Sequence, residues 1–208
     1  MNNRFAEFIK RYVSSDKIAQ WCASLESKHP FSFKITRQRN TKLGDYRYHK
    51  DIRGEHHQIS INYNLNKHQF LFTFLHEVAH RVCMERYGQK VKPHGEEWKR
   101  IFFVFLQDAL AQNFFPETLV EAIAAHAQNP KASCAADQRL YKLFSSFDTK
   151  TNNATYLSDI KLNSLFLFNN KCFRKLEMRR SRALCLNTHN QRKYLISGIA
   201  EVSSLEDE

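Results

Sequence analysis

The chain has 208 residues, 42% of them hydrophobic and 17 of them phenylalanine, so it can bury a core and is not a disordered tail. Its formal net charge of +11 favours polyanionic partners. The five widely spaced cysteines, without a C-x-x-C pair, indicate reduced thiols. The sequence shows neither a signal peptide nor a membrane span. We therefore expect a cytoplasmic monomer that does not engage membranes.

Two short amphipathic helices are predicted within residues 3–28, where apolar residues recur at helical spacing on both sides of a polar break. Pro30 ends the second helix. Three alternating, strand-like runs follow at residues 31–35, 43–48 and 57–63. We expect the first two runs to form a hairpin and all three to form a small antiparallel sheet.

A long buried helix is predicted next, with Asn66 as its amino-terminal cap and Gly88 at its carboxyl end. Its interior is apolar on most faces, so we expect it to lie at the centre of the domain. Residues 93–95 open another helix, which has a clear amphipathic stripe from Trp98 onward. One more helix is expected over residues 116–128.

The buried helix contains His76-Glu77-Val78-Ala79-His80, which matches the HExxH pattern. One helix turn in this pattern presents two imidazoles to the same zinc ion (Zn2+), and a catalytic site requires a third protein ligand. Two imidazoles and a carboxylate on a buried helix are costly without a metal. The sequence therefore predicts a zinc site on this helix.

The third ligand has several candidates. His94 is the best of them, because it stands before a helix that must pack on the motif helix, and Gly95 leaves room for close approach. Glu96 and Glu97 are the alternatives. Cys83 lies about 10 Å along the helix axis from the first histidine, too far to share the ion, and is expected in the core.

The stretch from His76 to Trp98 resembles the signature of the SprT-like metalloprotease family, which includes the Spartan proteases. The shared features are HExxH, an intervening basic and aromatic loop, and then H-G-x-x-W/F. The resemblance implies that the histidines at 76, 80 and 94 bind zinc and that Glu77 is the general base. With the predicted elements, it indicates an α+β, zincin-like domain with a small sheet and a buried HExxH helix.

The resemblance also implies how a substrate binds. In this family a strand before the motif helix binds the substrate backbone as an added strand, and residues 57–63 occupy that place. The candidate substrate-binding residues are Ile59, Ile61 and Tyr63.

Residues 131–208 are expected to form a small basic β module after a metalloprotease domain at residues 1–130. Strand-like runs occur at residues 156–160, 165–168, 172–176, 183–186 and 194–196, and hairpin turns are predicted at residues 169–170 and 189–191. The zinc ribbon of many family members is missing. Buried thiols are the expected role of the module's cysteines, and a second metal site is the alternative, formed by Cys134, Cys172, Cys185 and His189.

The β module also carries a candidate nucleic-acid surface. Its basic residues are Arg174, Lys175, Arg179, Arg180 and Arg182. These side chains could contact phosphates while Phe173 and Tyr194 stack on bases. The alternative is a solvated basic surface.

The leading hypothesis is a zinc-dependent metallopeptidase that hydrolyses peptide bonds through a zinc-activated water. Its candidate substrates are DNA-bound or DNA-crosslinked proteins, which makes DNA a candidate partner. Two alternatives belong to other classes. One is a nucleic-acid-binding adaptor with a structural zinc, and the other is a zinc hydrolase of a non-peptide substrate.

Overall fold

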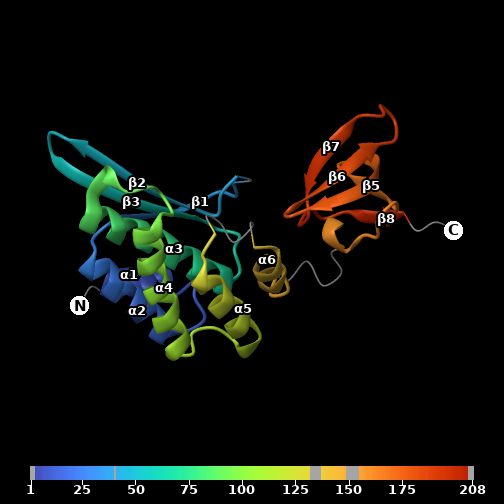
Figure 1. The fold of residues 1–208 in the computed structure, drawn as a ribbon. Coiled ribbons are helices and arrows are strands. Elements are labelled where there is room, and N and C mark those ends of the chain that lie inside the picture. The colour runs from blue at the N-terminus through green and yellow to red at the C-terminus, as the bar shows by residue number, and fades with distance from the viewer. Residues whose placement is uncertain (1–2, 40, 132–136, 149–154, 206–208) are drawn as a thin grey trace. The chain divides into compact units, whose positions relative to one another are not determined.

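The computed structural model describes residues 3–39, 41–131, 137–148 and 155–205, which form helices and two small β-sheets (Figure 1). The protein is therefore of the α+β class. It comprises two compact units, Met1–Ala132 (unit 1) and Ser133–Glu208 (unit 2). Over the described ranges, none of the helices combines the length and the apolar content needed to cross a bilayer.

Unit 1 contains a three-stranded sheet in the order β1–β3–β2. Strand β1 (Ser32–Thr36) runs parallel to β3 (Gly54–Asn62), whereas β2 (Gly44–Asp51) runs antiparallel to β3. The predicted hairpin between the first two runs is therefore wrong, as is the wholly antiparallel sheet. The hairpin instead joins β2 and β3, which leaves β2 and β1 as the two edges.

The connection from β1 to β2 passes over the end of β3, and polar side chains hold it there. Arg39 donates a hydrogen bond to Asn62 Oδ1 at 2.7 Å and another to Ser60 Oγ at 3.1 Å. Asn62 in turn donates to the carbonyl oxygens of Arg39 and Lys42. These bonds hold the connection at the end of β3, the strand that lies between β1 and β2.

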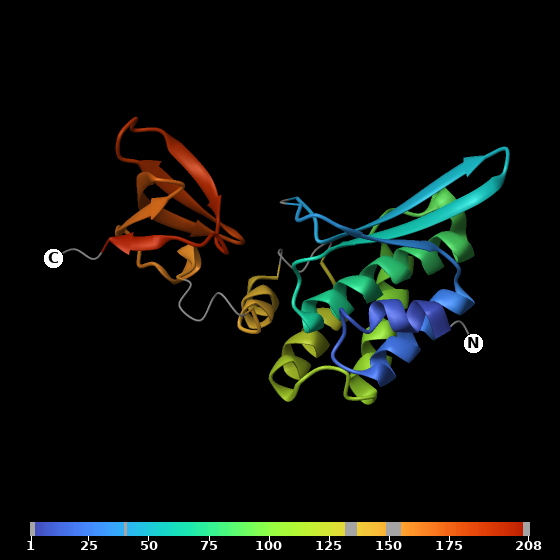
Figure 2. The same cartoon turned by 180° about the vertical axis from the view of Figure 1, so that it is seen from behind.

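The helices of unit 1 lie on one side of its sheet, as the two opposite views show (Figures 1 and 2). They are α1 (Asn3–Ile9), α2 (Asp16–Lys28), α3 (Lys67–Tyr87), α4 (Glu96–Ala111) and α5 (Glu117–Gln128), with the short 3-10 helix η1 (Gly88–Lys90) after α3. The inner face of the sheet presents fully buried Ile59 and Ile61, and α3 contributes fully buried Phe70 and Phe74. The core of unit 1 thus forms around α3.

The ends of α3 follow from its capping residues. The Asn66 side chain accepts a hydrogen bond from the Gln69 N–H at 3.0 Å. Gly88 ends the helix with a φ of 65°, a conformation that glycine adopts without steric cost. Both predicted boundaries are confirmed, and the central position of this helix follows from its 13 buried residues among 21.

Unit 2 contains a five-stranded antiparallel sheet in the order β7–β6–β5–β4–β8. Its strands are β4 (Leu165–Phe168), β5 (Lys171–Arg179), β6 (Arg182–Asn187), β7 (Lys193–Ser197) and β8 (Ser203–Leu205). Four of the predicted runs are strands, and the turn at residues 169–170 is confirmed by positive φ angles at both asparagines. The run at residues 156–160 is instead largely a 3-10 helix, η3 (Leu157–Asp159). Helix α6 (Gln138–Ser145) and strand β8 were not predicted from the sequence.

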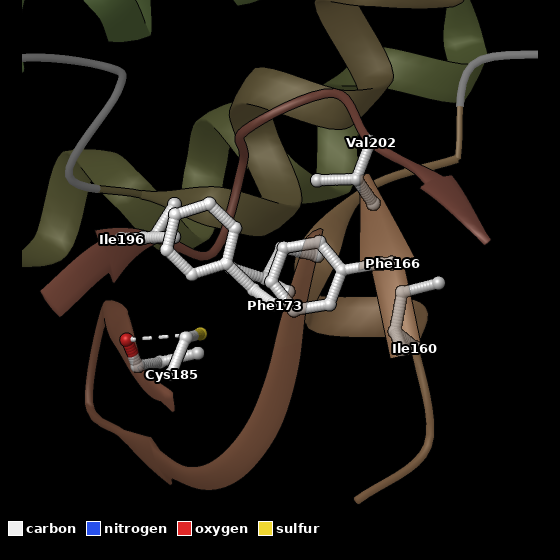
Figure 3. Close-up of a cluster of buried hydrophobic side chains, with 8 residues drawn as sticks. Ile160, Phe166, Phe173, Cys185, Ile196 and Val202 are labelled. Carbon is white, nitrogen blue, oxygen red and sulfur yellow. Dashed lines mark hydrogen bonds between the residues drawn. The ribbon is translucent and has the colours of Figure 1, made fainter. Parts of the chain in front are cut away.

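One face of this sheet covers a hydrophobic cluster (Figure 3). Phe166 and Phe173, on neighbouring strands, stack with ring centroids 5.8 Å apart. Cys185 and Ile196 reach the same cluster from β6 and β7, and Val202 precedes β8. Unit 2 therefore has a core of its own.

Lys175 lies on this core side of β5 and is 3% exposed. Its ammonium group donates to the carbonyl oxygens of Leu157, Ser158 and Ile160 at 2.9, 3.2 and 2.5 Å. Burial lowers the pKa of Lys175. The side chain ties η3 to the sheet and is not available to a phosphate, so Lys175 leaves the candidate nucleic-acid set.

Replacing Lys175 by methionine should destabilise unit 2 by roughly 1–3 kcal/mol, because three buried carbonyls lose their donor. The measurement is hydrogen exchange of β5 and β6 amides across a urea series. Arg174→Met, at an exposed neighbouring position, is the matched control and should change stability by less than about 0.5 kcal/mol. Equal effects of the two substitutions would contradict the structural role of Lys175.

Candidate metal centre

Three histidines of unit 1 converge at the junction of α3 and α4. His76 and His80 lie one turn apart on α3 and therefore share a face, and His94 lies in the loop before α4. The Nε2 atoms are 3.2 Å apart for His76 and His80, 3.1 Å for His76 and His94, and 3.0 Å for His80 and His94. Within the described ranges, these are the residues whose donor atoms come together as a metal ion requires.

The electrostatics of this cluster favour a cation. Burial lowers the pKa of all three imidazoles, well below the usual range for His76 and to about 3 for His80, so they are neutral near pH 7. A neutral imidazole has one N–H, so three Nε2 atoms at this separation cannot all hydrogen-bond to one another. Tetrahedral ligands at 2.0–2.1 Å from a zinc ion lie ~3.3 Å apart, close to the observed spacing. The donor set therefore fits a divalent metal.

Local backbone geometry positions His94. Its φ of 57° is in the left-handed region, where histidine is enriched among residues other than glycine. The Gly95 N–H donates to the Lys92 carbonyl at 2.9 Å, and a Cβ at Gly95 would approach that oxygen to 2.9 Å. Glycine at this position therefore allows the tight turn that brings His94 to the cluster.

Trp98, in the first turns of α4, packs against every ligand candidate. Its ring centroid lies 4.6 Å from that of His76, 5.1 Å from that of His80 and 4.7 Å from that of His94. The indole is fully buried and restricts the imidazoles to their present orientation. The sequence motif contained this tryptophan, but its role as a common packing surface is visible only in the fold.

Glu77 lies between the two helical histidines in sequence and projects toward strand β2. It accepts a hydrogen bond from the Tyr46 backbone N–H. A Cβ at Gly44 would lie 2.5 Å from Glu77 Oε1, so only glycine fits beside the carboxylate. Burial, followed by the nearby Asp45, raises the pKa of Glu77 to about 8. The side chain is a buried acid adjacent to the histidine cluster.

Tyr46 and His57 connect the sheet to this site and were missed from the sequence. The Tyr46 ring lies parallel to the His80 ring, with centroids 6.4 Å apart. Its hydroxyl lies 2.7 Å from His57 Nδ1. Gly44 could have been identified from the sequence, because glycine inside a strand often marks a place where another group approaches the backbone closely. Tyr46 and His57 could not have been identified in this way, because nothing in their sequence spacing relates them to the HExxH motif.

A pocket of about 420 Å³ lies beyond His57, between the β2–β3 hairpin and the end of α3. Arg81 is buried there, and its guanidinium donates to the Pro30 carbonyl and to Glu85 at 3.0 Å each. The pocket walls are mostly polar side chains, formed by Tyr48, Glu55, His57, Arg81, Met84, Glu85, Gly88 and Gln89.

The alternative ligands named from the sequence lie elsewhere. The Glu96 carboxylate pairs with Lys99 at 2.9 Å on the exposed surface. Neither Glu96 nor Glu97 belongs to the convergent group found among the described residues. Cys83 is buried, and burial raises the pKa of its thiol.

The structure contradicts the expected substrate strand. Strand β3 pairs with β1 through residues 58–62 and with β2 through residues 54–61, so it has no free edge along the motif helix. Ile59 and Ile61 are fully buried core residues, whereas Tyr63 is 59% exposed just beyond the strand. The free edge on the side of Glu77 belongs to β2. The alternation of apolar and polar residues identified this strand correctly, but such a pattern does not show that the strand lies in the middle of the sheet.

The residues named in the tail do not gather into one site. Cys134 lies outside the described residues, and Cys172, Cys185 and His189 form no convergent group within them. Phe173 is buried, which removes it as a base-stacking platform, and Tyr194 is 40% exposed. The remaining arginines are exposed at positions 174, 179, 180 and 182, and Arg179 pairs with Glu177 at 3.1 Å.

Comparison with known proteins links unit 1 to a family. A family model described as SprT-like matches residues 10–105, which contain the whole histidine cluster and none of unit 2. The chain is 34% identical over 77 residues to Protein SprT of Pseudomonas fluorescens, 38% over 80 residues to that of Pseudomonas entomophila and 45% over 40 residues to that of Pseudomonas aeruginosa.

These matches are partial. The first two cover 36% of this chain and 45% of the relative, and the third covers 19% and 24%. The chain thus spans less than half the length of these relatives. No solved structure matches it significantly.

The raised pKa of Glu77 predicts a pH-dependent effect of Glu77→Gln on the metal-free protein. Between the ordinary value of 4.5 and about 8, the folded state binds more protons than the unfolded state, so wild-type stability falls as pH rises through this range. Glutamine does not ionise, so it avoids the free-energy cost of burying a charged carboxylate. With chelator present, the variant should exceed wild type in free energy of unfolding at pH 8.5 by a few kcal/mol, and by much less at pH 5.

Urea unfolding at the two pH values measures this difference. Glu96→Gln, at an exposed carboxylate, is the control and should show no comparable change over the same range. If the free energy of unfolding of Glu77→Gln differs from that of wild type by the same amount at both pH values, the pKa of Glu77 is not raised.

Proposed function

Because this chain belongs to the SprT-like family through residues 10–105, we propose that it is a zinc-dependent metallopeptidase with a zincin-like catalytic domain. Membership itself suggests a metalloprotease-type function. The observation that carries the proposal is the convergence of three imidazole Nε2 atoms within 3.2 Å, beside a buried carboxyl group one residue from the first of them.

His76, His80 and His94 are the proposed zinc ligands. Bound zinc supplies Lewis acidity, which lowers the pKa of a coordinated water and polarises a carbonyl group. Three protein ligands are the number expected of a catalytic site, since a structural site is closed by a fourth. Within the described residues, no fourth cysteine, histidine or carboxylate joins the cluster, which argues against the structural-zinc adaptor.

Glu77 is the proposed general base. Its carboxylate takes a proton from the attacking water and later delivers it to the leaving amine. The pKa of about 8 in the metal-free protein falls when a cation lies nearby, which brings the group toward the neutral range where proton transfer in both directions is efficient. The Tyr46 N–H and the absence of a side chain at Gly44 fix its position.

The free edge of β2 is the proposed substrate-binding element. The Tyr46 N–H donates to Glu77, so β2 lies directly beside the proposed catalytic carboxylate. An extended peptide can pair with such an edge through main-chain hydrogen bonds, independently of its sequence. This arrangement supports a peptide substrate over a small non-peptide one.

Proteins bound or crosslinked to DNA are the proposed substrate class. The support is electrostatic: the chain carries a net charge of +11, and residues 1–130 alone hold 19 Lys or Arg against 13 Asp or Glu. A basic protein concentrates near the DNA polyanion, and hence near proteins held on it.

Glu77→Gln should retain one zinc per chain and lose at least about 100-fold in cleavage rate, because the base is removed while the ligands stay. The assay measures metal content and the cleavage of a purified DNA-binding protein, with and without duplex DNA. Glu96→Gln serves as control and should cleave like wild type. Wild-type cleavage by Glu77→Gln would overturn the assignment of the base, and the absence of bound zinc in wild type would overturn the proposal.

A further inference from the structure

The sheet of unit 2 has a second face, opposite the cluster in Figure 3, and this face is rich in leucine. Residues directly opposite one another on neighbouring strands point to the same side of a sheet. One such row runs from β8 to β7 and consists of Leu205, Leu165, Arg174, Leu186 and Lys193. Its members alternate along their strands with the buried Phe166, Phe173 and Cys185, so the row faces away from the core.

Two further pairs extend this face. Leu184 on β6 lies opposite Leu195 on β7, and Leu167 on β4 lies two residues from Leu165 on the same side. Leu195 is 50% exposed, Leu167 39% and Leu205 37%. We call these six leucines, at positions 165, 167, 184, 186, 195 and 205, the leucine face.

The leucine face departs from the usual pattern of a one-sided sheet. An antiparallel sheet that covers a core on one side normally carries polar residues on the other. A single exposed leucine requires no explanation, whereas a contiguous apolar patch on a protein surface marks an interaction site. Leu165 lies opposite Leu205, and Leu184 lies opposite Leu195 and two residues from Leu186. The leucines therefore form two apolar clusters on the same surface, one on each side of β5.

Cations are interspersed with the leucines. Arg174 lies between Leu165 and Leu186, and Lys193 lies next to Leu186 on the outer side. Arg182 shares the face, because it is two residues from Leu184 on β6. Over the part of the chain that the structure describes, no carboxylate oxygen lies within 4.0 Å of the charged nitrogens of these three side chains. Glu177, opposite Leu184, and Arg179, opposite Arg182, share this face and pair with each other at 3.1 Å. The face is therefore apolar with a net positive charge.

We propose that the leucine face docks an acidic amphipathic segment of a partner protein. The apolar side chains of the partner would cover the leucines, while its carboxylates pair with Arg174, Arg182 and Lys193. This binding role is separate from peptide hydrolysis in unit 1.

Other occupants fit less well. Single-stranded nucleic acid binds sheets through aromatic side chains, and this face has none: Phe173 lies in the core, and Tyr194 lies opposite the buried Cys185 on the other side. A second copy of this face would bring like charges together. The face is both apolar and positively charged, and an acidic amphipathic protein segment complements both properties.

The test is fluorescence anisotropy with the full-length chain and a labelled synthetic peptide of alternating leucine and glutamate. We expect saturable binding that weakens about tenfold or more in Leu195→Ser and in Arg174→Glu. The matched controls are Leu162→Ser, 57% exposed in the same unit, and Lys161→Glu, both outside the strands, and these should bind like wild type.

Three outcomes would overturn the proposal. The first is no saturable binding of the peptide, or equal binding of a serine–glutamate peptide, which would remove the apolar contribution. The second is equal loss of binding in the face variants and in their controls. The third is tighter binding of this face to duplex DNA, to phosphatidylserine vesicles or to a second copy of the chain, detected as loss of that binding in Leu195→Ser and Arg174→Glu.

Discussion

The structure of unit 1 depends on holding three neutral imidazole nitrogens within 3.2 Å of one another. Such a cluster cannot be stabilised by hydrogen bonds among its own members, so the surrounding fold has to hold the three rings in place. Helix α3 fixes two of the rings at a spacing of one turn, the left-handed backbone at His94 brings in the third, and Trp98 packs against all of them.

The same helix links the cluster to the sheet. Glu77 is buried under β2 because Gly44 has no side chain and because the Tyr46 N–H meets the carboxylate. That position of β2 depends in turn on the connection that Arg39 and Asn62 hold across β3. An edge strand, a buried carboxyl group and a histidine cluster are thus coupled through a few contacts, and this coupling supports the proposal of a peptide substrate and a hydrolytic reaction.

The helices of unit 1 and the pairing of His76 with His80 were predictable because their signals are local. A spacing of four on a helix places two side chains on one face, whatever the rest of the fold does. The sheet order was not predictable, because alternation reports which face of a strand is buried and says nothing about its neighbours. Lys175 illustrates the same limit, since its charge suggested the surface while its position in the alternation, two residues from Phe173, placed it in the core. Tyr46 and His57 meet only through tertiary structure.

We propose that the histidines at positions 76, 80 and 94 bind one zinc ion and leave a coordination position for water. X-ray absorption spectroscopy at the zinc edge of the zinc-loaded protein measures this coordination. Three imidazole nitrogens and one further light atom are expected at about 2.0–2.1 Å, with the loss of one imidazole in His94→Ala. A sulfur ligand, four imidazoles, or an unchanged spectrum in His94→Ala would contradict it.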